Sequence, residues 1–193
     1  MYKRQVYLIP WIIPPVSSSI LFRTLLDANT GPITQMIKFI TGKSVMILDQ
    51  ADTALIAVIV HNFWRSFPFA MLFLAAGLTM ISKDVYEAAI IDGASKIKQF
   101  FYITLPLVKN HLFIVVLMIT NWTLQDSESC YSLTKGGPGT ATEMVAVRLF
   151  KDSFVYFEIN TGAVIGIVMM CISIIFAVIY YWLTKAKEME SYE

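Results

Sequence analysis

Several polar side chains lie inside the apolar stretches of this sequence, where each is costly if it faces lipid. They are amides, one cation, one carboxylate and one indole, groups that can hydrogen-bond to or stack against a polar solute. The same amides also suit hydrogen bonds between neighbouring helices, so both interpretations stay open. The candidate residues of a solute pathway are Asn62, Arg65, Asn121, Trp122, Gln125 and Asp126.

The residue patterns of hydrolases and metal sites do not occur in the sequence. It has no HExxH pair, no nucleophile elbow and no paired carboxylates within an apolar stretch. His61 and Arg65 share a helix face, but they have no Cys, Asp or Glu nearby to complete a metal site. The stretch TKGGPGTAT lacks the Gly-Lys pair of a phosphate-binding loop and predicts a turn-rich external loop. We therefore expect no catalytic residue, no metal and no cofactor in this chain.

The composition is typical of a membrane protein. Of the 193 residues, 56% are apolar and 15% are charged, and the mean hydropathy is +0.63, more than one soluble core of this size needs. The 15 basic and 14 acidic residues nearly cancel, so no overall field attracts nucleic acid. A long apolar run separates Cys130 from Cys171, which argues against a disulfide.

Four apolar stretches are long enough to cross a hydrocarbon core, which takes about 20 residues. Prolines in the first two predict kinks in those helices. The distribution of Lys and Arg predicts that the loop 81–107 is cytoplasmic and that both chain termini lie on the same side. The fold class is therefore an all-α polytopic membrane helix bundle, one domain over 1–193, with spans at about 6–26, 54–80, 108–126 and 162–184.

The loop 81–107 predicts two short helices joined by a turn. Asp84 and Glu87 have the spacing of a capping box, so the first helix is expected to begin near residue 85. Gly93 suits its end, and Ser95 is a candidate N-cap for an amphipathic second helix that Pro106 bends into the third span. Such an apolar knob folds back on the protein's own helices, lies flat in the membrane interface, or docks a soluble partner.

The loop resembles the EAA loop of the permease subunits of binding-protein-dependent ABC importers. Its motif reads Glu-Ala-Ala, three residues, Gly, nine residues, and then Ile-x-Leu-Pro. FPFAMLFLAAGLTMISKDVYEAAIIDGA and the segment YSLTKGGPGTATE are similar to the sugar-type members, the maltose and glycerol-phosphate permeases. The positions that this resemblance places against an ATPase are Glu87, Ala88, Ala89, Asp92, Gly93, Ala94, Ile103, Leu105 and Pro106.

The resemblance implies a non-enzymatic subunit that passes a sugar or related carbohydrate into the cytoplasm of a bacterium or archaeon. It implies four partners: a cytoplasmic ABC ATPase dimer that binds the ATP, a second permease subunit in a heterodimer, an extracytoplasmic solute-binding protein and the lipid bilayer of the cell membrane. Glu87 would then either cap its helix or pair with a basic residue of the ATPase. The alternative is a membrane-embedded scaffold whose loop docks a partner other than an ATPase.

The beginning of the chain departs from this family. Such permeases commonly have six core spans, and the four here resemble the last four. The first residues, MYKRQ, match the translation of a common transposase library adapter read from a GTG start. We therefore expect an N-terminally truncated fragment whose residues 1–5 derive from the adapter, the alternative being a native basic N-terminus.

Overall fold

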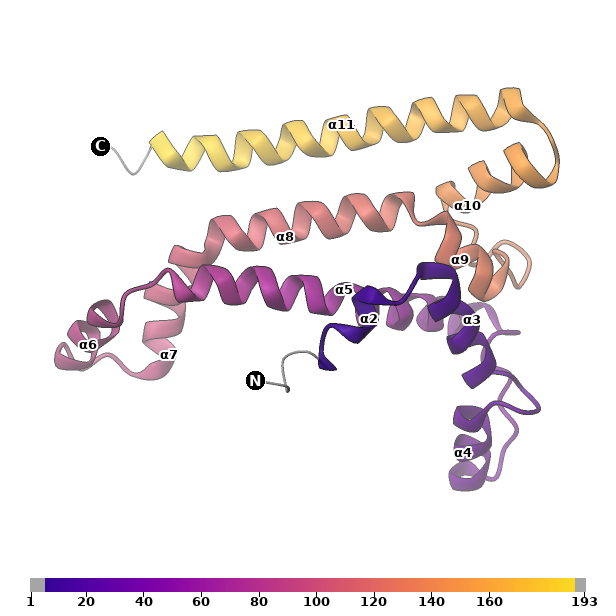
Figure 1. Cartoon of the computed structure of the whole chain (residues 1–193), viewed down its shortest axis with the longest axis horizontal. Coiled ribbons are helices and arrows are strands. Elements are labelled where there is room, and N and C mark those ends of the chain that lie inside the picture. The colour runs from indigo at the N-terminus through magenta and orange to yellow at the C-terminus, as the bar shows by residue number, and fades with distance from the viewer. Residues whose placement is uncertain (1–5, 190–193) are drawn as a thin grey trace.

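A computed structural model describes the backbone of residues 6–189 and the side chains of residues 6–182. Figure 1 shows long helices running side by side, with short helices gathered at their two ends. Within the described residues, no segment is a β-strand. The elements are α2 (Ile9–Ile12), α3 (Pro15–Leu25), α4 (Pro32–Thr41), α5 (Ala51–Thr79), α6 (Lys83–Ile91), α7 (Lys96–Gln99), the π-helical η1 (Phe100–Thr104), α8 (Leu105–Gln125), α9 (Ser127–Thr134), α10 (Val145–Phe150), the π-helical η2 (Lys151–Val155) and α11 (Ile159–Met189).

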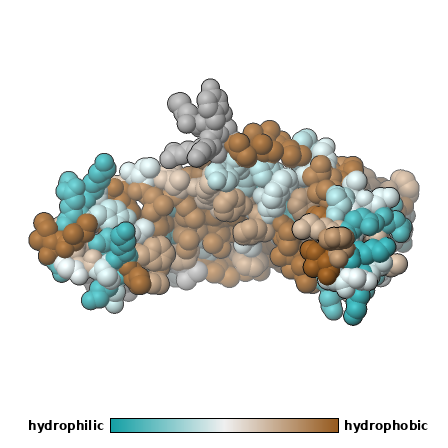
Figure 2. All heavy atoms as spheres, turned by 90° about the horizontal axis from the view of Figure 1, so that it is seen from below, coloured by the Kyte–Doolittle hydropathy of each residue, from teal (hydrophilic) through white to brown (hydrophobic). Residues whose placement is uncertain are grey.

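Three helices of the described chain are long and apolar enough to cross a membrane. They cover Ala51–Thr79, Lys96–Gln125 and Ile159–Trp182, and α5 continues through Pro68 without a break. Figure 2 shows the corresponding surface as an apolar belt between two more polar ends. In the most apolar 18-residue stretch of the helix Ile159–Trp182, only 6% of the residues are buried within the chain. Lipid or other subunits must therefore cover this helix. The predicted all-α membrane bundle is confirmed.

The first predicted span is wrong as a single kinked helix over 6–26. α2 ends at Ile12, Ile13 and Pro14 have extended backbone, and α3 begins at Pro15. Proline lacks an N–H and disfavours helical backbone in the residue before it, so two consecutive prolines separate the helices. α2 packs against α5 within the belt, and α3 packs against α9 at one end.

The connections between the long helices lie alternately at the two ends of the belt. α6 and α7 lie at one end together with the C-terminal end of α11, whereas α3, α4, α9 and α10 gather at the other (Figure 1). The C-terminal end of α11 thus shares a side with the loop 81–107, as predicted. Residues 1–5 lie outside the described residues, so their adapter origin and the predicted side of the N-terminus stay predictions.

The buried apolar core lies at the end opposite α6. Val58 of α5 packs with Cys130 and Leu133 of α9 and Val147 of α10. Cys130 is 1% exposed, and burial raises the pKa of its thiol to about 12. The thiol is therefore neutral and acts as a small apolar side chain.

Candidate functional site

The loop after α5 begins with a helix whose start differs from the prediction. Ser82 is the N-cap of α6, with extended backbone and no capping hydrogen bond from its side chain. Asp84 lies in the first turn and Glu87 one turn later, so the predicted capping box is wrong. Glu87 is exposed, which leaves its carboxylate accessible to another molecule.

α6 ends in a left-handed turn at Gly93, as predicted. The φ angle of Gly93 is +74°, the Ala94 amide donates to the Ala89 carbonyl at 2.9 Å, and the Gly93 amide donates to the Ile90 carbonyl at 3.0 Å. These bonds form a Schellman motif, in which glycine is favoured. A Cβ at Gly93 would meet no heavy atom within 4 Å, so the requirement for glycine comes from the backbone conformation alone.

Two side-chain contacts fix the helix that follows. Ser95 caps α7 as predicted, since its Oγ accepts a hydrogen bond from the Lys98 amide at 3.4 Å. The Tyr86 hydroxyl on α6 lies 2.9 Å from the Thr104 hydroxyl on η1. The second contact joins two segments on opposite sides of the Gly93 turn, so the two helices form one compact knob.

The knob joins α8 through the π-helical turn η1. In η1 the Leu105 amide donates to the Phe100 carbonyl, five residues earlier. Pro106 follows at once, and its missing N–H and its ring prevent a regular helical bond to the Tyr102 carbonyl. Figure 1 shows the chain turning between α7 and α8, the bend predicted at Pro106.

α6 and the turn after it project beyond the end of α5 (Figure 1), and the knob carries exposed apolar side chains. Ile91 is 86% exposed and Ile97 is 72% exposed. These side chains are not covered by the chain's own helices and are open to contact with another molecule. Of the motif positions, Ala89 is buried, Ala94, Ile103 and Leu105 are half-buried, and Glu87, Ala88, Asp92, Gly93 and Pro106 are exposed.

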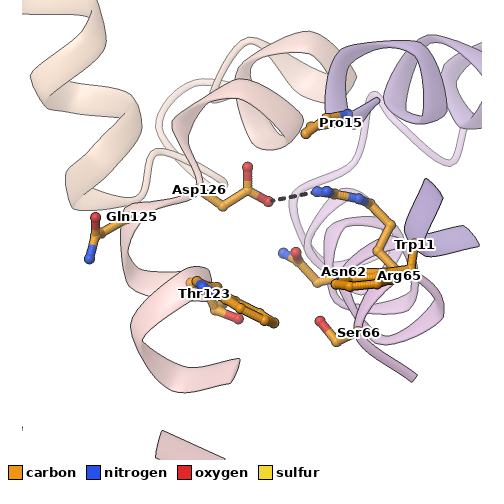
Figure 3. A pocket seen from close by; sticks show the side chains of 9 residues that line it. Trp11, Pro15, Asn62, Arg65, Ser66, Thr123, Gln125 and Asp126 are labelled. Atoms are coloured by element: carbon orange, nitrogen blue, oxygen red, sulfur yellow. Dashed lines mark ion pairs between the residues drawn. The ribbon is translucent and has the colours of Figure 1, made fainter. Parts of the chain in front are cut away.

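A polar cavity lies between the broken first segment, α5 and the end of α8 (Figure 3). Its volume is about 300 Å³. Five of the six predicted pathway residues line it, although they come from segments about sixty positions apart. The complete lining is Trp11, Pro15, Asn62, Arg65, Ser66, Trp122, Thr123, Gln125 and Asp126.

Arg65 is held at the cavity wall by Ser129 of α9 and by Asp126, the N-cap residue of that helix. Its Nη1 donates to the Ser129 hydroxyl at 2.8 Å and lies 3.8 Å from Asp126 Oδ2 (Figure 3). Asp126 caps α9 by accepting from the Ser129 amide at 2.9 Å. The ion pair offsets the charge of the Arg65 guanidinium. Arg65 Nε is buried without a hydrogen-bond partner, which leaves one donor unsatisfied.

Aromatic rings form the apolar part of the cavity wall. The Trp122 ring meets Phe69 edge-on at 4.7 Å between centroids, and Trp11 lies 6.3 Å from the same ring. Indole faces beside amides and hydroxyls suit a ligand with both ring faces and hydroxyl groups. The sequence reasoning missed Trp11, since no local signal places a residue of a broken helix against α5.

Asn121 does not line this cavity. It accepts a hydrogen bond from Gln125 one turn later and faces an apolar pocket between α8 and α11. Figure 3 shows the Gln125 side chain turned away from Arg65. The structure therefore brings five of the six pathway candidates to the cavity and leaves Asn121, hydrogen-bonded to Gln125, on the side of α8 nearer α11.

Ion pairs hold the turn after α9 against α10 and η2. Glu143 contacts both Lys151 and Arg148, and Arg148 Nε lies 2.9 and 3.0 Å from the two carboxylate oxygens of buried Asp152. The hydrogen bond from Lys151 is the main reason that the pKa of Glu143 lies below its usual value. The predicted turn-rich loop is thus held in place by ion pairs to the helices that follow it. Across the part of the chain that is described, no cluster of three potential metal ligands occurs.

Long apolar helices, a projecting knob with the EAA spacing and a polar cavity between spans define a membrane transport subunit. The chain belongs to the family of binding-protein-dependent transport system inner membrane components, whose model matches residues 4–188. This family consists of transport components, in agreement with the expectation that the chain is not an enzyme.

Named relatives and solved structures are similar over most of this chain. The sulfoquinovosyl glycerol transport system permease protein of Agrobacterium fabrum is 28% identical over 96% of this chain and 60% of its own length. The trehalose/maltose transport system permease protein of Thermococcus litoralis is 32% identical over 92% of this chain and 60% of its own length. The chain therefore spans about 60% of these relatives.

The fold is similar to chains of bacterial alginate transporters. One crystal structure, of an ABC transporter involved in the import of the acidic polysaccharide alginate, matches with a TM-score of 0.84 at 20% identity, over 96% of this chain and 66% of that one. A second, with an alginate pentasaccharide-bound periplasmic protein, matches with a TM-score of 0.80 at 21% identity, over 93% of this chain and 64% of that one. This likeness establishes the fold.

Proposed function

We propose that the subunit containing this chain forms part of the membrane path of an ATP-driven importer for a sugar or related carbohydrate. The observation that carries the proposal is the knob of α6 and α7, which combines the complete EAA spacing with a Gly93 turn and an exposed apolar surface. Family membership and the names of the relatives support the same function.

The knob docks into a cytoplasmic ABC ATPase dimer, which binds the ATP. Its two helices are tied by the Tyr86–Thr104 contact, and a compact body of this kind transmits motion between subunits without deforming. Glu87 is exposed and pairs with a basic residue of the ATPase, since the structure gives it no capping role. This end of the molecule, with the C-terminal end of α11, is therefore the cytoplasmic one.

The solute passes through the polar cavity beside Arg65. Trp11 and Trp122 supply apolar faces, while Asn62, Ser66 and Thr123 supply hydrogen-bonding groups, a combination that suits a carbohydrate. The relatives are named for sulfoquinovosyl glycerol and for trehalose and maltose, which is the same chemical class. Asn121 and Gln125 contribute from the side of α8 that faces α11.

Three further partners complete the importer in the cell membrane of a bacterium or archaeon. A second permease subunit covers part of the exposed belt and forms a heterodimer with this one. A solute-binding protein docks at the end that carries α9 and α10, where the ion pairs around Glu143 keep the surface rigid. Lipid surrounds the remaining apolar side chains.

Transport by the reconstituted complex tests this proposal. The complete subunit, its partner permease and the ATPase are placed in liposomes with the binding protein, and ATP-dependent uptake is measured for carbohydrates and for amino acids. We expect uptake of a mono- or oligosaccharide, reduced by Trp122→Ala in the cavity but not by Phe63→Ala on the exposed face of α5. Tight binding of an amino acid and none of any carbohydrate would overturn it.

A further inference from the structure

α4 is an amphipathic helix at the end of the molecule opposite the knob. Its apolar residues recur at the spacing of one helix face, with Phe39 beside them, and Lys38 lies on the opposite face. Phe39 is 91% exposed and Ile40 is 69% exposed, so no other part of the described chain covers this face. The apolar residues are Ile33, Met36, Ile37, Phe39 and Ile40.

The polar side of α4 is held by the chain's own preceding turn. The Thr34 hydroxyl donates to the carbonyls of Asp27 at 2.5 Å and Gly31 at 2.7 Å, and Thr34 is 2% exposed. The side-chain amide of Gln35 donates through Nε2 to the Asn29 carbonyl at 2.5 Å. These contacts fix the rotation of α4 about its own axis, so its apolar face is held pointing away from the protein.

The position and direction of α4 identify what covers this face. Figure 1 shows α4 running across the direction of the three long helices, which is parallel to the plane of the membrane that they cross. Residues 42–50 connect α4 to the first residue of α5, and Figure 1 shows α4 at the end of the molecule where α5 begins. Leu55, Ile56 and Ile59, in the first turns of α5, are also apolar and exposed.

We propose that α4 is an interfacial anchor that lies in the outer surface of the lipid bilayer. Its apolar face enters the boundary between headgroups and acyl chains, while Lys38, and Lys43 just after the helix, extend to the phosphate groups. Basic residues opposite an apolar face with an aromatic residue are typical of such helices. Gly42, with a φ of +70°, ends the helix where the chain turns toward α5.

The anchor sets the depth at which α5 enters the membrane. α3 packs against α4 on one side and against α9 on the other, so α4 is joined to the helices that surround the polar cavity. A helix held at the bilayer surface therefore keeps this end of the permease at a constant height while the other end moves with its partners. The proposal adds a lipid contact to the proposed function and does not depend on the identity of the solute.

Site-directed spin labelling tests the proposal in the complete transporter reconstituted in lipid nanodiscs. The native residues Cys130 and Cys171 are replaced, and a nitroxide is attached at Phe39→Cys or at the neighbouring position Lys38→Cys, which lies about 100° around the helix on its polar side. Collision rates with oxygen, which concentrates in lipid, and with a water-soluble nickel chelate are then measured. We expect an oxygen-to-nickel ratio several-fold higher at position 39 than at position 38.

Two results would overturn the interfacial anchor. Equal ratios with free access of nickel to position 39 would mean that the face lies in water. Exclusion of both reagents from position 39 would mean that a protein subunit covers it. If the Phe39→Cys variant does not assemble, Ile40→Cys reports on the same face. None of these readings depends on transport, so they remain distinct from a failure of the proposed function.

Discussion

Replacement of Gly93 by valine should uncouple the knob from its ATPase without affecting the membrane spans. Gly93 has a φ of +74°, and a Cβ there would meet nothing within 4 Å, so the whole cost lies in the backbone. The left-handed conformation costs a non-glycine residue roughly 1–2 kcal/mol. This free energy lowers the population of the closed turn relative to open ones by a factor of about 5–30.

The assay is co-purification of the ATPase with each variant, together with substrate-stimulated ATP hydrolysis in reconstituted membranes. Gly93→Val should still insert and pair with its partner permease, because the hydrogen bonds of the spans are made within each helix. It should lose ATPase association or coupled hydrolysis, whereas Gly93→Asn should keep most of both, since asparagine tolerates the left-handed conformation.

Gly42 offers a matched control for this experiment. It has a φ of +70°, and a Cβ there also meets nothing within 4 Å, but it lies at the opposite end of the molecule. Gly42→Val should therefore carry the same local strain and leave the ATPase bound. Normal coupling in Gly93→Val, or an equal loss in both valine variants, would refute the assignment of α6 and α7 as the coupling element.

Two further predictions concern ion pairs. Asp126→Asn should destabilise the subunit by about 1–3 kcal/mol, because it leaves the largely buried Arg65 without its counter-ion. Thermal unfolding in detergent measures this loss. The double variant Asp126→Asn, Arg65→Gln should recover part of it. The Lys151 contact lowers the pKa of Glu143, so the ionised carboxylate stabilises the folded turn at pH values above the usual glutamate pKa. This stabilisation is lost as the pH falls through the lowered pKa of Glu143. Proteolysis of the turn 135–144 should therefore increase in acid in the native protein and change less with pH in Glu143→Gln; identical pH profiles would contradict this.

The local parts of the knob were predictable because they depend on neighbouring residues. A glycine after a run of helix formers ends a helix, and a serine before the next run caps it, and both Gly93 and Ser95 do so. The start of α6 was less predictable. Ser82, Asp84 and Glu87 lie within one stretch, and the sequence does not tell which residue begins the helix, because capping depends on where the backbone first turns helical.

The broken segment 6–26 shows the limit of hydropathy as a signal. Its apolar composition is that of a membrane helix, yet Pro14 and Pro15 together remove two donors and force extended backbone at Ile13. Hydropathy averages over a window and does not register whether neighbouring helices satisfy the freed carbonyls. The resulting gap allows Trp11 to reach the cavity beside Arg65.

The sequence alone determined the class of this protein, three of its spans and the turn within the EAA motif, because hydropathy, turn chemistry and motif spacing are properties of contiguous residues. The tertiary structure decided which polar residues meet. Arg65 and Asp126 form one ion pair although sixty positions separate them, while Asn121, only five residues before Asp126, belongs to another face of α8. It also decided that α4 turns its apolar face outward, since hydrogen bonds to the preceding turn hold its polar side. Such outcomes depend on how helices pack and rotate against one another, and no local pattern encodes that.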